Sequence, residues 1–163
     1  MGYLEDGCTR DLAFFGVAAS KEFRYRWNAL GLAVSDWVRA DVKDQNPDLT
    51  RFVARLYRIC LGREFDFGGL TAWVQALVSG YSGAKIVTGF AHSREFAAMT
   101  EDDNEYVSRL YEAILGREPD ERGLANWLGS LEKGYTRDQV LRGFLRSREF
   151  KALCAGYGIT AFD

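Results

Sequence analysis

The sequence predicts an all-α fold in which tandem four-helix repeat units pack into a compact helical array. Three observations support this prediction. Residues 52–99 align without a gap onto residues 106–153 at a constant offset of 54, and 22 of the 48 pairs are identical. Apolar residues recur at helical spacing in both copies, and strand-like alternation is weak throughout. Such a period is typical of modules that bury an apolar face against their neighbours.

The first helix of each repeat is expected over residues 48–61 and again over residues 105–115. Pro47 suits a helix start because its missing N–H would have no partner there, and Gly62 suits a left-handed stop. The apolar stripe of the first copy follows helical spacing and consists of Phe52, Val53, Leu56, Tyr57, Cys60 and Leu61.

The second helix follows an aspartate in both copies. Asp66 and Asp120 are expected to cap it, because a short carboxylate accepts hydrogen bonds from the free N–H groups of a first turn. Trp73 and Trp127 share helical spacing with leucines on the same stripe. We therefore favour a place in the core for both tryptophans over a role as stacking platforms for sugars.

The third helix is expected to begin after Ser82 and Thr136, and Thr136 with Gln139 has the spacing of a capping box. The fourth helix is short, and Phe96 and Phe150 are expected to anchor it in the core.

A glycine recurs inside the third helix at Gly16, Gly89 and Gly143. Glycine in a helix interior costs about 1 kcal/mol relative to alanine. Its recurrence indicates the close approach of another helix or, less favoured, a helix that breaks at this point.

Residues 7–23 match the back half of both repeats. Because the chain opens in the middle of a unit, we expect it to be a segment of a longer array. The predicted organisation is a partial repeat at 1–33, a connecting segment at 34–47 with a short helix near 35–42, a full repeat at 48–101, and a full repeat with a C-terminal tail at 102–163.

The composition favours a packed core, since 47% of residues are hydrophobic and 14% are aromatic. The net charge is −2, with no basic stripe of the kind that phosphate neutralisation requires. No apolar run approaches the roughly 18 residues that would span a bilayer. We therefore predict no nucleic-acid partner and no membrane span.

Few residues suggest chemistry. Cys8, Cys60 and Cys154 stand where other copies have large apolar residues, so the thiols are expected to fill core space, with one disulfide as the alternative. A metal site is disfavoured because no CxxC or Cys/His spacing exists. His92 is the single histidine, and Arg146 replaces it in the second copy. Nothing marks a catalytic partner for His92, so we predict no enzyme activity, no cofactor and no metal.

Charged residues recur in the first helix, at the corner after it, and in the fourth helix. They could form a repeated ligand site for an acidic or sugar-like group. We favour ion pairs that tie each corner to the fourth helix, because arginine binds carboxylates in a bidentate manner. The expected pairs are Arg63 with Glu95 and Arg117 with Glu149, and the other recurring ions are Arg55, Arg109, Glu64 and Glu118.

Several motifs carry a family resemblance. They are the runs 52–57, 61–64 and 69–73, their second copies at 106–111, 115–120 and 123–127, and the segments 44–47, 143–150 and 154–159. Together these motifs resemble a bacterial repeat family known only as a domain of unknown function (number four-two-one-four). The resemblance covers nearly the whole chain. Phe65 departs from the proline found at Pro119, which loosens the local turn.

This resemblance implies a module of secreted or surface-attached bacterial proteins, often beside enzymatic or adhesive domains and without established catalytic residues. A fainter similarity to phycobilisome linker domains, which are helical protein–protein adaptors, favours an interaction role by analogy. We expect a non-catalytic structural or protein-interaction module at the cell surface or outside the cell. The alternative is a carbohydrate- or cell-wall-binding module accessory to an enzyme. The expected partners are other domains of the parent protein, a surface partner, or a second copy bound through an uncovered repeat end.

Overall fold

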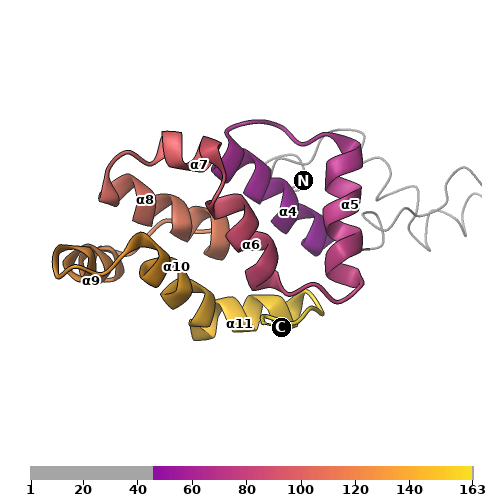
Figure 1. The fold of residues 1–163 in the computed structure, drawn as a ribbon. Helices are drawn as coiled ribbons and strands as arrows, with labels where there is room; N and C mark the ends of the chain where they lie inside the picture. Colours follow the sequence, from indigo (N-terminus) through magenta and orange to yellow (C-terminus); the bar gives the residue numbers. More distant parts are fainter. Residues whose placement is uncertain (1–45, 163) are drawn as a thin grey trace, which may run out of the picture.

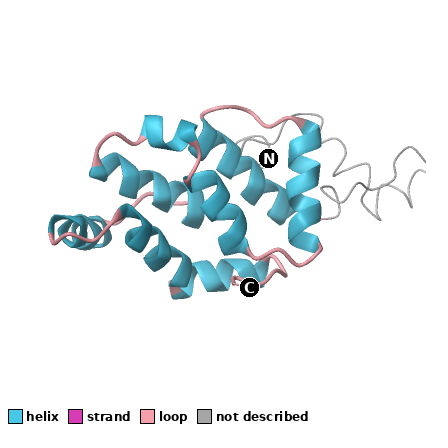
Figure 2. Cartoon of the chain, viewed as in Figure 1, coloured by secondary structure: helices cyan, strands magenta, loops and turns pink. Residues whose placement is uncertain are grey.

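The computed structural model describes residues 46–162 and confirms the all-α prediction. Helices joined by short loops form this part of the chain, which contains no strand (Figure 2). No helix in the same range is both long and apolar enough to cross a bilayer. The predicted partial repeat at 1–33, the helix near 35–42 and Cys8 lie outside the described residues.

Each repeat contributes four helical segments in the predicted order. The first repeat contains α4 (Pro47–Leu61), α5 (Phe67–Val78), α6 (Gly83–Ala91) and α7 (Arg94–Met99). The second contains α8 (Asp103–Leu110), which continues into a π-helical turn, η1 (Tyr111–Leu115), and then α9 (Glu121–Glu132), α10 (Arg137–Arg146) and α11 (Arg148–Gly156).

The first helices of the two repeats meet in the middle of the molecule, while α5 and α9 lie at opposite ends (Figure 1). Helix α4 packs against α5, α6 and α7 of its own repeat and against η1 of the other. One continuous apolar core runs through both repeats. Its largest fully buried side chains are Phe52, Phe96, Phe144 and Phe150.

Side-chain caps begin the second and third helices of both repeats. Each cap oxygen accepts a hydrogen bond from the backbone N–H three residues later, at 2.7 to 3.2 Å, and the four caps are Asp66, Asp120, Ser82 and Thr136. Thr136 also forms the full capping box with Gln139. The first helix of each repeat ends at a glycine in the left-handed region, Gly62 (φ 63°) and Gly116 (φ 71°).

The core aromatics divide into two kinds. Phe96 and Phe150 are both 1% exposed. The two tryptophans are only partly buried, and each packs its ring on a core phenylalanine: Trp73 on Phe90 and Trp127 on Phe144, with ring centroids 5.6 and 5.0 Å apart. The tryptophans therefore cover the core at its edge, where a large ring keeps one side exposed to water.

The two repeats differ in how well their second helix is covered. Helix α5 buries Leu70, Val74 and Leu77, whereas α9 contains no fully buried residue. The equivalent apolar positions of α9 are Leu124, Leu128 and Leu131, which are only partly buried. The α9 end of the molecule therefore keeps an apolar face partly open to solvent.

The recurring helix glycines behave differently from the expectation. Helices α6 and α10 run through Gly89 and Gly143 without a break, so the broken-helix alternative is wrong. A Cβ at Gly143 would meet the indole of Trp127, whereas a Cβ at Gly89 would meet nothing within 4 Å. Close approach to the helix glycine therefore occurs only in the second repeat, and the group that approaches is a side chain, not another helix backbone. The cause is ring orientation, because Trp127 lies 22° from the plane of Phe144 but Trp73 lies 51° from the plane of Phe90.

This difference predicts opposite effects of the same substitution in the two repeats. Gly89→Ala should stabilise the protein by up to about 1 kcal/mol, because alanine favours the helix and the site has space. Gly143→Ala should destabilise it by about 1–3 kcal/mol, because the indole must leave its stack on Phe144. Urea unfolding followed by circular dichroism measures both variants. Equal effects of the two substitutions would contradict the asymmetry of the tryptophans.

Candidate functional site

The most strongly repeated motif builds the corner between the first and second helices. In the second repeat the Arg117 guanidinium lies over the Tyr111 ring, 5.0 Å from its centroid, and Asp120 accepts the N–H of Gly123 at 2.8 Å. A Cβ at Gly123 would meet the Tyr111 hydroxyl, so only glycine fits there. Arg63, Tyr57, Asp66 and Gly69 form the same arrangement in the first repeat.

Burial of both corner tyrosines, followed by the nearby aspartate charge, raises the pKa of the Tyr57 and Tyr111 hydroxyls. These hydroxyls therefore stay protonated at neutral pH, and the motif residues around them hold the chain turn in place. The repeated motif has a structural explanation that requires no ligand.

In the second repeat, Arg117 joins the corner to the fourth helix. Its Nε and Nη2 donate to the two carboxylate oxygens of Glu149 at 2.7 and 2.9 Å, and Nη1 donates to the Glu118 carbonyl. The hydrogen bond from Arg117 lowers the pKa of Glu149 below its ordinary value of 4.5. This bidentate geometry is the strong form of an arginine–carboxylate pair.

The predicted pair of Arg63 with Glu95 is wrong. In the described part of the chain Arg63 donates to the Glu64 carbonyl at 3.5 Å, and no ion pair joins it to Glu95. The loops that follow the two first helices differ at a single position, where Phe65 replaces Pro119. Proline fixes the backbone of the second loop, whereas the Phe65 ring packs edge-on against Phe67 with centroids 5.9 Å apart.

The two repeats hold each other through equivalent arginines. Arg55 of the first repeat donates to the carbonyls of Ala113 and Ile114 at 3.1 and 3.3 Å. Arg109, which lies 54 positions later, donates to the carbonyl of Ile59 at 3.3 Å. These carbonyls belong to the last turns of the first helices, where no backbone donor follows. Each repeat therefore caps the C-terminal end of the first helix of the other.

A second reciprocal contact forms at the start of the third helices. In the first repeat, the N–H of Gly83 donates to the Thr160 carbonyl at 2.8 Å, beyond the fourth helix of the other repeat. In the second, Arg137 occupies the equivalent position and donates to the carbonyls of Thr100 and Glu101 at 2.7 and 3.2 Å. Such mutual contacts are typical of a two-fold pair, in which the interface closes, and differ from head-to-tail stacking.

His92 has a partner that the sequence did not reveal. Its Nε2 lies 2.9 Å from Oδ1 of Asp138, and both side chains are more than half exposed. Arg146 and Ala84 occupy the equivalent positions in the other full repeat, so the period of 54 could not have paired His92 with Asp138. A histidine–carboxylate pair acts as a general base only when a nucleophile or a bound water lies beside the histidine to give up a proton. Among the described residues the hydrogen-bond partner of His92 is Asp138.

Cys60 and Cys154 are buried and free. Burial raises the pKa of Cys60 to about 12 and that of Cys154 to about 11. Both sulfurs therefore stay protonated and unreactive at neutral pH. Between residues 46 and 162 no cluster of three histidine, cysteine or acidic side chains has the arrangement of a metal site.

These contacts define a class of protein, a helical tandem-repeat module in which the recurring residues maintain the turn and join the repeats. The chain belongs to the family described as Domain of unknown function (DUF4214), whose model matches residues 29–100 and again residues 98–154. The two matches confirm the resemblance and its count of about two units. No curated protein and no solved structure matches the chain significantly.

The reciprocal arginines predict that the protein loses stability when the Arg55 side chain is removed. Arg55→Ala should destabilise the protein by about 1–3 kcal/mol, because it leaves two partly buried carbonyls without a donor. Arg58→Ala is the matched control, since this exposed arginine lies on the same helix and should change stability by less than about 0.5 kcal/mol. Urea unfolding distinguishes them. Equal losses would show that Arg55 does not join the repeats.

The Arg117–Glu149 ion pair predicts an energetic coupling between the corner and the fourth helix in the second repeat, and none in the first. A double-mutant cycle of Arg117→Ala and Glu149→Ala should give a coupling free energy of up to about 1 kcal/mol. The value is small because both side chains are well exposed. The same cycle for Arg63 and Glu95 is the control and should give a coupling near zero.

The coupling should also depend on pH. Because the folded-state pKa of Glu149 is lowered, its stabilising contribution is complete above the ordinary value of 4.5 and is lost as the pH falls through the lowered pKa. Thermal or urea unfolding at neutral and acidic pH measures this loss. A coupling that persists in strong acid, or that is equal in both repeats, would contradict the assignment.

Proposed function

We propose that this chain is a non-catalytic structural or protein-interaction module of a larger bacterial protein that is secreted or attached to the cell surface. One observation supports it above all. The residues that recur in both repeats form the corners and join the repeats through Arg55 and Arg109. Residues preserved between copies therefore have a role in maintaining the shape of a rigid body, which is what a spacer or adaptor requires.

The chemistry of the described residues supports a role without catalysis. The His92–Asp138 pair is exposed to solvent, and the two described thiols are buried and protonated. The location outside the cell and the bacterial origin follow from the family resemblance alone. The expected partners are other domains of the parent protein or a component of the surface.

The partly open face of α9 supports an interaction role. Leu124, Leu128 and Leu131 retain exposure at positions where the first repeat buries its equivalents. These partly buried leucines leave apolar surface that a partner protein can cover. Self-association through this uncovered repeat end stays a prediction.

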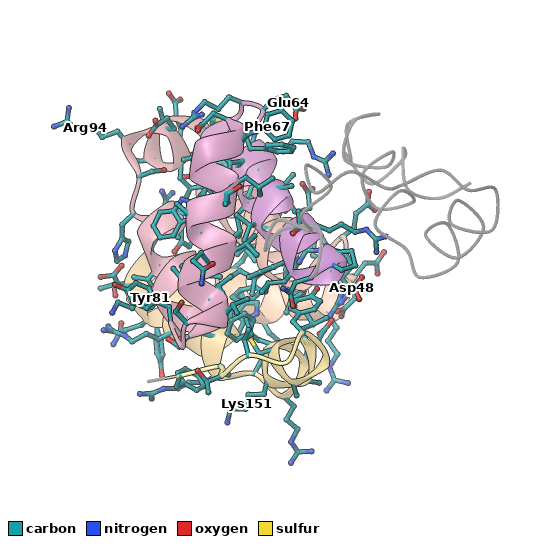
Figure 3. The ribbon with its side chains drawn as sticks, turned by 90° about the vertical axis from the view of Figure 1, so that its right-hand side faces the viewer. Asp48, Glu64, Phe67, Tyr81, Arg94 and Lys151 are labelled. Atoms are coloured by element: carbon teal, nitrogen blue, oxygen red, sulfur yellow. The ribbon has the colours of Figure 1, made fainter. Side chains whose placement is uncertain are left out.

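A carbohydrate- or cell-wall-binding role is the second candidate, and one observation favours it. Tyr81 and Tyr135 occupy equivalent positions and are 44% and 55% exposed. Tyr81 lies just beyond the end of α5 (Figure 3), with the Lys85 ammonium 4.1 Å from its ring centroid. An exposed tyrosine ring offers a surface on which a sugar can stack. The tryptophans support the first candidate, because they pack on Phe90 and Phe144.

Sedimentation with insoluble peptidoglycan and with cell-wall polysaccharide distinguishes the two functions. For an interaction module the chain should stay in the supernatant at every polysaccharide concentration. Addition of the polysaccharides should also leave acrylamide quenching unchanged in a Trp27→Phe/Trp37→Phe variant, which reports on the two packed tryptophans. Saturable sedimentation that is lost in Tyr81→Ala/Tyr135→Ala would contradict the proposal and establish the carbohydrate-binding role.

A further inference from the structure

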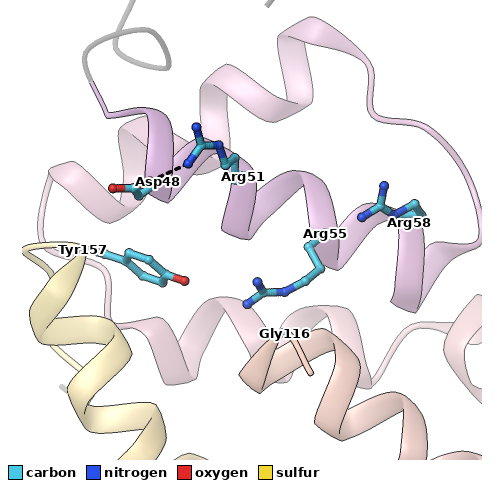
Figure 4. Close-up of a pocket in the computed structure, with 6 residues that line it drawn as sticks. All are labelled: Asp48, Arg51, Arg55, Arg58, Gly116 and Tyr157. Atoms are coloured by element: carbon cyan, nitrogen blue, oxygen red, sulfur yellow. Dashed lines mark hydrogen bonds and ion pairs between the residues drawn. The ribbon is translucent and has the colours of Figure 1, made fainter. Parts of the chain in front are cut away.

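A polar pocket of about 270 Å³ lies where the two repeats meet. Helix α4 forms one side, the turn that ends η1 forms the floor, and the end of α11 closes the third side (Figure 4). Its lining residues are Asp48, Arg51, Arg55, Arg58, Gly116 and Tyr157. The pocket therefore contains groups from both repeats, and three of the six are arginines.

The charge of this lining is strongly positive. Three arginines and one aspartate leave an excess of two positive charges. Asp48 binds Arg51 at 2.8 Å and so compensates one guanidinium. Arg55 binds two neutral carbonyls, which leave its charge uncompensated. Arg58 is exposed, and the structure gives it no ion pair among the described residues.

The second repeat shows that the fold does not require this charge. At the offset of 54, Arg55 corresponds to Arg109, and both cap the first helix of the other repeat. Arg51 and Arg58 correspond to Glu105 and Glu112, which carry the opposite charge. The same framework is therefore built with acidic residues in one repeat and basic residues in the other. The framework therefore does not require a basic residue at position 51 or 58.

The pocket is ordered in a way that favours an anion. The carbonyls of Ala113 and Ile114 fix the Arg55 guanidinium through Nε and Nη2, and among the described residues Nη1 forms no hydrogen bond. A guanidinium held in place loses less entropy on binding. Gly116 keeps this space open, because a Cβ there would meet the Arg55 guanidinium.

Tyr157 completes the set of donors. Its ring lies 5.5 Å from that of Phe52, and its hydroxyl points into the pocket toward Arg55 (Figure 4). A phenol can donate a hydrogen bond to an oxyanion beside two guanidinium groups. Guanidinium groups form charge-assisted, often bidentate, hydrogen bonds with carboxylate and phosphate oxygens.

We propose that this pocket binds a small ligand through one oxyanion group, a carboxylate, sulfate or phosphate, that Arg55, Arg58 and Tyr157 hold between the two repeats. Arg51, whose charge Asp48 compensates, completes the lining. This inference goes beyond the proposed structural role, because a rigid spacer needs no anion site.

Titration of the ¹⁵N-labelled full chain, followed by NMR at constant ionic strength, tests the proposal. The probes are inorganic phosphate, inorganic sulfate and glucuronate, with neutral glucose as the control. At least one anion should bind saturably and shift the resonances of α4, Gly116 and Tyr157, whereas glucose should shift none of them. The preferred probe identifies whether the natural ligand carries a carboxylate, a sulfate or a phosphate.

Two charge reversals separate a site from a general charge effect. Arg58→Glu introduces the residue type that Glu112 provides in the second repeat, so it should fold, and it should weaken anion binding about tenfold or more. Arg122→Glu makes the same change in net charge on α9, outside the pocket, and should leave the affinity unchanged. Circular dichroism verifies that both variants are folded.

The proposal is overturned if none of the three anions binds saturably. It is also overturned if Arg58→Glu and Arg122→Glu weaken binding equally, since binding would then depend on net charge alone. Resonance shifts confined to residues that do not line the pocket would also overturn the proposal.

Discussion

Arg55 and Arg109 cap the first helix of the opposite repeat, and the rest of the structure depends on this exchange. A helix that ends inside a protein leaves its last carbonyls without backbone donors, and these groups must find partners. Here the partner comes from the other repeat in both directions. A cation at a helix C-terminus also interacts favourably with the helix dipole. The two repeats are therefore a closed pair, and neither satisfies its own central helix alone.

Closure explains why the two copies could diverge elsewhere. Once the central arginines and the corner motif are retained, the surfaces around them are free to change. The second repeat has its Arg117–Glu149 pair, whereas the first has Phe65 packed on Phe67 in the corresponding loop. The third helix begins with Gly83 in one copy and Arg137 in the other, although both contact the end of the opposite repeat. Divergence on a shared framework also produced a basic pocket beside α4, while the positions equivalent to Arg51 and Arg58 are the acidic Glu105 and Glu112.

The candidate sites show why repetition alone was a limited guide to function. Recurrence correctly indicated residues with a structural role, such as Asp66 and Asp120, whose carboxylates cap helices. Some of the contacts that distinguish the two repeats involve residues that differ between them. His92 meets Asp138, 46 positions later, and Arg58 and Tyr157 line the same pocket. The period of 54 has no information about such pairs, because each partner differs from the residue at the equivalent position of the other full repeat.

The sequence by itself determined the helical class, the order of the helices in each repeat, their caps and the family, because local propensities and apolar spacing act over a few residues. Only the tertiary structure decided how the repeats close on each other, since reciprocal contacts join residues 50 to 59 positions apart. It also decided that Trp127, but not Trp73, lies against the helix glycine, and that Arg63 does not reach Glu95. Those outcomes depend on side-chain packing, in which one ring orientation or one proline changes which groups can meet.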